Sequence, residues 1–188
     1  MILLEFLKQI NWLDIFLVIL LIRICYISTR NGLPDQLFWF LGTIGAIYIS
    51  LHYYVGFADF IGKRFLLTEI PIEYRQTISF VLLALAGYVL FVLLQKIFSR
   101  FIKMEATPRL NKYGGIVLGV IRGFLVSGLI FFIFLMSTVV YLQHSVHTSY
   151  AGRHLSRIAP ATYSWLWNNL MSKFMPSEKF NSAVLKIK

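Results

Sequence analysis

Two charged residues, Asp14 and Arg122, interrupt stretches of the chain that are otherwise apolar. A charge inside a membrane is costly, so such residues usually pair with an opposite charge or line a polar path for ions or substrates. The acids that we consider as partners of Arg122 are Asp14 and, near a turn, Asp35. The alternative is that Arg122 lies close enough to one helix end to extend its side chain to the membrane surface.

The same segment, GGIVLGVIRGFLVSGLIFF (residues 114–132), carries small residues at a spacing of four. They are Gly115, Gly119, Gly123 and Ser127. At about 100° per residue they form one helix stripe, and Arg122 projects only about 20° away from Gly115. Small residues let membrane helices approach closely, so we predict a helix–helix contact here, either inside one bundle or between protomers. The expected partner stripe consists of Gly42, Gly45 and Ala46.

Residues that could support catalysis or bind a metal are scattered. His144 and His147 are three residues apart, but no acid or cysteine pair accompanies them. The single cysteine, Cys25, permits neither an intramolecular disulfide nor a cysteine metal site. We therefore expect a protein that is not an enzyme and has no metal or cofactor. The net charge of +10 is expected to meet lipid headgroups, because no nucleic-acid motif accompanies it.

The composition indicates which elements carry these residues. Of the 188 residues, 58% are hydrophobic, which is more than a soluble domain of this length can bury. A bilayer core about 30 Å thick needs about 20 apolar residues per spanning helix. Four runs meet that length, at about residues 10–27, 37–54, 78–98 and 114–142. We predict an all-α fold in which residues 1–142 form a four-helix transmembrane bundle.

Three linkers connect the four runs. The first contains Gly32, which we assign to the turn after the first helix. The second, residues 55–77, is interrupted by Gly56, Gly62 and Pro71, and its middle, FADFIGKRFLL, predicts a short interfacial helix. Basic residues are nearly equal on the two sides of the bundle. We favour the first and third linkers in the cytoplasm because the third is short and densely basic, and the opposite orientation stays open.

Residues 143–188 form a polar, basic tail with one periodic segment. After Pro160, apolar residues recur at helical spacing and polar residues occupy the opposite face. The apolar residues are Tyr163, Leu166, Trp167, Leu170, Met171 and Phe174. We predict an amphipathic helix over about residues 161–175, ended by Pro176. Its aromatic face lies either in the membrane interface or against the end of the bundle.

Three of these segments resemble the colicin V production protein (CvpA) family of small bacterial inner-membrane proteins. They are NWLDIFLVIL, NGLPDQLFWFLG and NKYGGIVLGVIRGFLV, and the likeness covers about residues 11–142. The last is the most specific, because it resembles the family's basic-flanked Gly-x3-Gly-x2-Arg-Gly helix. The chain departs from the family at Asp35-Gln36, where relatives often carry Arg-Glu, and at Asn111, where they often carry an acid.

The resemblance implies a role in producing or exporting the toxin colicin V, and in envelope homeostasis, from a multi-pass position in the inner membrane. Our first hypothesis is a non-enzymatic protein that acts through helix contacts with itself or with a membrane or envelope protein. The alternative is a small transporter or channel, which would need several copies because four helices are few for a pore. A membrane enzyme is the third and weakest hypothesis.

Overall fold

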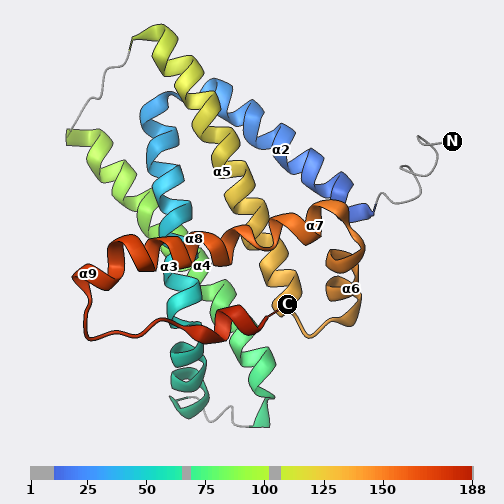
Figure 1. Cartoon of the computed structure of the whole chain (residues 1–188). Helices are drawn as coiled ribbons and strands as arrows, with labels where there is room; N and C mark the ends of the chain where they lie inside the picture. The colour runs from blue at the N-terminus through green and yellow to red at the C-terminus, as the bar shows by residue number, and fades with distance from the viewer. Residues whose placement is uncertain (1–10, 65–68, 102–106, 188) are drawn as a thin grey trace, which may run out of the picture.

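A computed structural model describes residues 11–64, 69–101 and 107–187 of the chain, and within these parts it is helical and contains no strand. The four long helices are α2 (Trp12–Arg30), α3 (Leu33–Arg64), α4 (Ile72–Phe101) and α5 (Pro108–Met136). Each is long and apolar enough to cross a membrane. Figure 1 shows them as a bundle in which α2 lies on one side of α5, and α3 and α4 lie on the other. The predicted all-α, four-helix architecture is confirmed.

The second linker is largely helical, which corrects the predicted separate interfacial helix at residues 57–67. α3 continues for 32 residues through Gly56 and Gly62 to Arg64, and residues 65–67 of the prediction lie outside the described part. A glycine costs a helix only about 1 kcal/mol, so packing can carry the helix through it. A Cβ atom at Gly62 would meet the guanidinium of Arg75, which is the flexible end of a side chain.

The lengths of α2 and α3 show how much of the bundle fits a bilayer. α2 has 19 residues, about 28 Å at ~1.5 Å per residue, which matches the hydrocarbon core. The 32 residues of α3 are about 48 Å long by the same measure. In Figure 1 the lower ends of α3 and α4 extend beyond the tail helices. This end carries Asp59, Lys63, Arg64 and Glu73, so we assign it to the aqueous side.

The fourth helix ends at Met136, earlier than the predicted Leu142. The last carbonyl groups of a helix have no intrahelical hydrogen-bond donor. Here side chains from other parts of the chain donate to them. Gln143 donates to the carbonyls of Leu135 (3.2 Å) and Ser137 (2.7 Å), and Thr77 of α4 donates to that of Met136 (2.9 Å). The chain can therefore turn into the next helix without leaving these groups unsatisfied.

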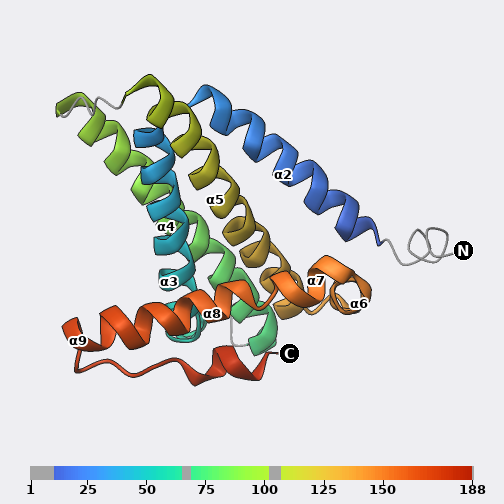
Figure 2. The same cartoon turned by 45° about the horizontal axis from the view of Figure 1, so that its top comes forward.

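The remaining elements are short. They are α6 (Val140–Thr148), α7 (Tyr150–Leu155), α8 (Ile158–Leu166), the π-helix η2 (Trp167–Met171), α9 (Ser172–Phe174) and the 3-10 helix η3 (Ser182–Lys186). Figure 2 shows α8 running across the long helices, and it contacts α3 and α5. The predicted tail helix at residues 161–175 corresponds to α8, η2 and α9. It starts earlier, at Ile158, because Pro160 is tolerated in a first helical turn.

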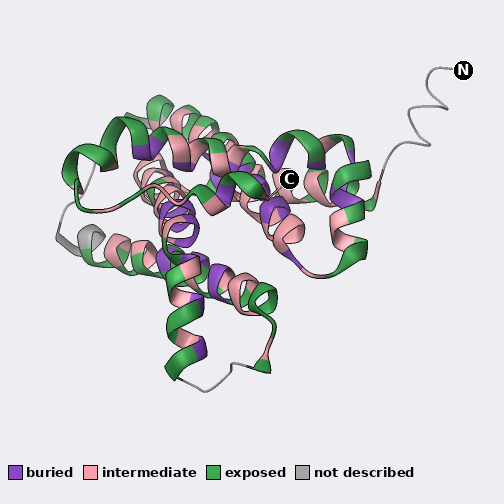
Figure 3. Ribbon diagram, turned by 60° about the horizontal axis from the view of Figure 1, so that its bottom comes forward, coloured by how far each residue is buried: buried purple, intermediate pink, exposed green. Residues whose placement is uncertain are grey.

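The aromatic face of the tail helix divides into a buried part and an exposed part. The sequence predicted that this face meets either the membrane interface or the end of the bundle. Tyr163, Leu166 and Trp167 are buried in the core against α3. Leu170 and Phe174 are exposed, because the wider π-helical turn interrupts the regular helical face. Figure 3 shows the buried positions where helices face one another and exposed positions along their outer sides. The first part of the face therefore packs on the bundle, and only its end is free to meet a membrane surface.

A polar cluster around His52 fastens the last segment of the chain to α3. The imidazole contacts the Tyr163 hydroxyl (2.9 Å) and the Glu178 carboxylate (2.5 Å). The Tyr163 hydroxyl also accepts from the Asn181 amide (3.0 Å), and Asn181 donates to the carbonyl of Leu51 (2.8 Å). Burial raises the pKa of the Tyr163 hydroxyl; the hydrogen bond from the Asn181 amide opposes this effect and the nearby Glu178 charge adds to it.

Candidate functional site

The glycine stripe of α5 packs against α2 of the same chain. A Cβ atom at Gly119 would overlap the Ser28 hydroxyl and lie 2.5 Å from the Ser28 Cβ. At Gly123 it would lie 2.9 Å from Leu21. At Gly115 it would lie 3.1 Å from the backbone oxygen of Asn31, in the turn between α2 and α3. The stripe therefore brings two helix backbones together, and α3, which we had expected as its partner, does not fill it.

The small residues of α3 face α4 instead, which corrects the expected pairing of the two stripes. Cβ atoms at Gly42 and Gly45 would both collide with Phe91 of α4. One at Gly87 of α4 would lie 3.0 Å from the Cα of Ala46. Ser127, at the end of the α5 stripe, is buried and donates to the carbonyl of Gly123 in its own helix (2.7 Å). Two separate sets of small residues thus build the order α2, α5, α3, α4.

Asp14 binds the tail helices and is not the partner of Arg122. Its carboxylate accepts from the Asn11 amide (2.9 Å), the Ser149 hydroxyl (2.7 Å) and the Ala151 amide (2.9 Å). Ser149 is the N-cap of α7, so the negative charge lies at the amino-terminal end of that helix, where it is favoured. Asp14 is in the first turn of α2, whereas the glycines on either side of Arg122 pack against Leu21 and Ser28, about two or more turns further along that helix. The hypothesised pairing of Asp14 with Arg122 is therefore wrong.

Arg122 is buried, with 6% of its surface exposed, and its charge meets an aromatic ring rather than a carboxylate. The guanidinium carbon lies 4.9 Å from the ring centre of Trp39, and Nη1 has no hydrogen-bond partner in the described parts of the chain. The Trp39 indole donates to Gln95 (2.7 Å), and the Gln95 amide donates to Asp35 (2.8 Å). Asp35 thus approaches Arg122 only through two intervening side chains.

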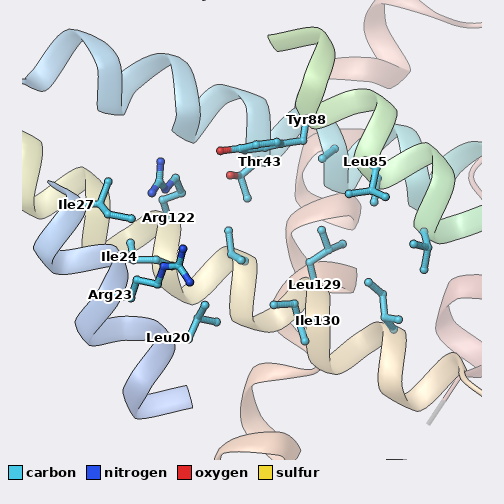
Figure 4. Close-up of a pocket in the computed structure, with 15 residues that line it drawn as sticks. Leu20, Arg23, Ile24, Ile27, Thr43, Leu85, Tyr88, Arg122, Leu129 and Ile130 are labelled. Carbon is cyan, nitrogen blue, oxygen red and sulfur yellow. The ribbon is translucent and has the colours of Figure 1, made fainter. Parts of the chain in front are cut away.

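A cavity of about 390 Å³ lies beside Arg122, between α2 and α4. All four long helices line it, and its walls are mostly aliphatic. Figure 4 shows Arg23 and Arg122 at one end, Tyr88 and Thr43 above, and Leu85, Leu129 and Ile130 towards the other end. Arg23 and Leu85 are exposed, so the cavity reaches the outer surface of the bundle at membrane depth. The lining contains two guanidinium groups and no carboxylate.

Gln36 and Asn111, where the resemblance implies charged residues, both lie at contacts between α5 and the start of α3. Gln36 is fully buried, its amide has no partner among the described residues, and its oxygen lies 3.6 Å from a Cβ placed at Gly119. Asn111 accepts from the amide of Leu33 (2.6 Å) and lies directly against Gly32. The predicted turn residue Gly32 therefore leaves room for a side chain that caps α3. The side chains of Gln36 and Asn111 are both neutral amides, and of the two it is Asn111 that has a hydrogen-bond partner among the described residues.

Sequence reasoning missed Arg23, Trp39 and Gln95 as parts of this environment. Arg23 carried a signal, because it interrupts the apolar run of the first helix as Arg122 does in the fourth. Trp39 and Gln95 come from different helices and meet only in the folded bundle. In the described residues no group of three or more His, Cys, Asp or Glu side chains could hold a metal ion.

A comparison with protein families gives a match over most of the chain. A family model described as "Colicin V production protein" matches residues 13–160, whereas neither the curated proteins nor the solved structures that were compared include a match. The expected likeness ended near residue 142, so the match extends further and includes α6 and α7. With four helices able to cross a membrane, the chain is a multi-pass membrane protein, and it belongs to the colicin V production protein family.

Proposed function

We propose that this chain supports the production and export of colicin V, and envelope homeostasis, as a non-catalytic protein of the bacterial inner membrane. Its family and its four apolar helices favour this role. The observation that carries the mechanism is the packing of α5 on α2, which places Arg122 beside a cavity at membrane depth. In this proposal the contacts between helices of one chain form the surface through which the protein acts.

A contact with a second copy or with a membrane or envelope protein would have to use other surfaces, because α2 of the same chain fills the α5 stripe. The outer face of α2 is the natural candidate, since its exposed apolar side chains reach the surface from one end to the other. They are Ile15, Val18, Ile19, Ile22 and Tyr26. An apolar helix face of this kind can be covered by lipid as well as by protein. The face therefore permits a protein partner without requiring one.

The test is complementation. A colicin V-producing host that lacks its own member of this family would carry either this chain or its Gly119→Leu variant. We expect this chain to restore the growth-inhibition zone on a sensitive lawn, and the variant to restore little of it. Immunoblots of membrane fractions and a Gly56→Leu variant, at a position with open space, are the controls. Failure of the membrane-inserted wild-type chain to restore the zone would contradict the proposal.

A small oligomeric transporter or channel is the second candidate, and the cavity beside Arg122 is the observation that favours it. Thr43 lines this cavity from α3 and is nearly fully buried. If the cavity joins a water path, Thr43→Cys in a Cys25→Ser background should react with a membrane-impermeant thiol reagent added to vesicles from one side. Protection from both sides, with Tyr53→Cys labelled as the exposed control, would argue against a transport path.

A further inference from the structure

We propose that the cavity between α2 and α4 binds the phosphate-bearing headgroup of an anionic phospholipid. Arg122 and Arg23 would hold the phosphate, and the aliphatic wall of the cavity would hold part of an acyl chain. This inference concerns a ligand site and does not depend on the proposed role in colicin V production.

The first argument is the unmet hydrogen-bonding capacity of Arg122. A buried guanidinium without an anionic partner is costly, since the group carries five donors and a permanent charge. The Trp39 ring supplies a cation–π contact, but Nη1 has no acceptor among the described residues and lies in a side chain that is only 6% exposed. In the described parts of α2 and α3, the carboxylate near this end is that of Asp35, and it accepts a hydrogen bond from Gln95.

The second argument is the position of the guanidinium. Trp39 lies in the second turn of α3, so Arg122 lies about 10 Å from the end of the bundle that carries the first and third linkers, at ~1.5 Å per residue. Burial prevents its side chain from extending to the headgroup layer. A lipid, by contrast, can slide in from the side, because the cavity reaches the outer surface beside Arg23 and Leu85.

The third argument concerns the choice of lipid. The lining provides two positive groups, and no carboxylate that could receive the ammonium of a zwitterionic headgroup. The remaining wall is mostly aliphatic. The volume of the cavity, about 390 Å³, falls within the range of about 300–1,000 Å³ that is usual for small-ligand sites. Arginine and phosphate form bidentate, charge-assisted hydrogen bonds. We therefore expect the site to prefer lipids whose headgroups carry a net negative charge.

The test uses the full chain, purified in a mild detergent and titrated with phosphatidylglycerol or phosphatidylcholine of the same acyl composition. Native mass spectrometry would count bound lipids, and melting temperature would report stabilisation. We expect the wild-type chain to retain phosphatidylglycerol tightly. In Arg122→Gln the affinity for this lipid should fall about tenfold or more, because one charge-assisted hydrogen bond is worth about that much. Arg64→Ala, an exposed arginine at the opposite end of the bundle, is the matched control and should bind as wild type.

Arg23→Ala provides a second variant, because Arg23 is exposed and its loss should leave the fold intact. It should also weaken phosphatidylglycerol binding, with an unchanged gel-filtration profile. Equal retention of the two lipids, or wild-type binding by Arg23→Ala and Arg122→Gln, would overturn the proposal. Stabilisation by inorganic phosphate alone, with no lipid retained, would also overturn it, because the site would then bind a free anion.

Discussion

Replacing Gly119 with leucine is expected to separate α2 from α5 and to destabilise the whole bundle. No side chain fits at this position, because even a Cβ atom would overlap the Ser28 hydroxyl and approach the Ser28 Cβ to 2.5 Å. Overpacking of a close contact costs about 1–3 kcal/mol and more where the backbone must move. We expect the leucine variant to lose most of its folded population in detergent, measured by gel filtration after a temperature ramp.

Two further variants locate the cause of this loss. Gly56→Leu makes the same substitution in a helix where no atom lies within 4 Å, and it should melt as wild type. Gly119→Ala should be partly rescued by Ser28→Gly, since removing the Ser28 side chain makes room for the new methyl group. A Gly119→Leu protein as stable as wild type, or no rescue in the double variant, would show that α2 does not pack against Gly119.

Replacing Asp14 with alanine should give the second large effect, the release of α6 and α7 from the end of α2. The carboxylate accepts three hydrogen bonds, and its removal leaves the Ser149 hydroxyl and the Ala151 amide without an acceptor. A donor left unsatisfied in a partly buried site costs about 1–3 kcal/mol. We expect a lower melting temperature and faster tryptic cleavage at Arg153 and Arg157, which lie just beyond this contact.

The conservative and control variants separate the hydrogen bonds from the charge. Asp14→Asn keeps one acceptor oxygen, so its loss of stability should be smaller than that of Asp14→Ala. Asp59→Ala removes an exposed acid from α3 and should change neither property. If Asp14→Ala had the cleavage rate and melting temperature of wild type, the carboxylate would not hold the tail on α2.

The four spans and the all-α class could be predicted from the sequence because membrane helices are set by length and hydropathy, which are local properties. The tail helix was predictable for the same reason, since its spacing is visible in one short segment. The end of α5 at Met136 was not, because it depends on Gln143 and Thr77 reaching its carbonyl groups.

The partners of the polar and small residues could not be predicted, because composition does not say which helices are neighbours. The stripes at Gly42 and Gly119 consist of the same kinds of small residue, yet one faces α4 and the other α2. Asp14 and Arg122 are opposite charges in apolar runs, so pairing them was reasonable. The structure separates them because the α7 amino terminus takes the carboxylate and Trp39 takes the guanidinium.

The glycine stripe of α5 is an internal contact with α2 that holds Arg122 beside the cavity. The most direct test is oxidation of native membranes containing Gly123→Cys and Leu21→Cys, singly and together, in a Cys25→Ser background. A Cβ at position 123 would lie 2.9 Å from the end of Leu21, and that flexible end can give way. We predict a disulfide within one chain in the double variant and no dimer from either single variant. A cross-linked dimer from Gly123→Cys alone, with no bridge inside the double variant, would contradict the account.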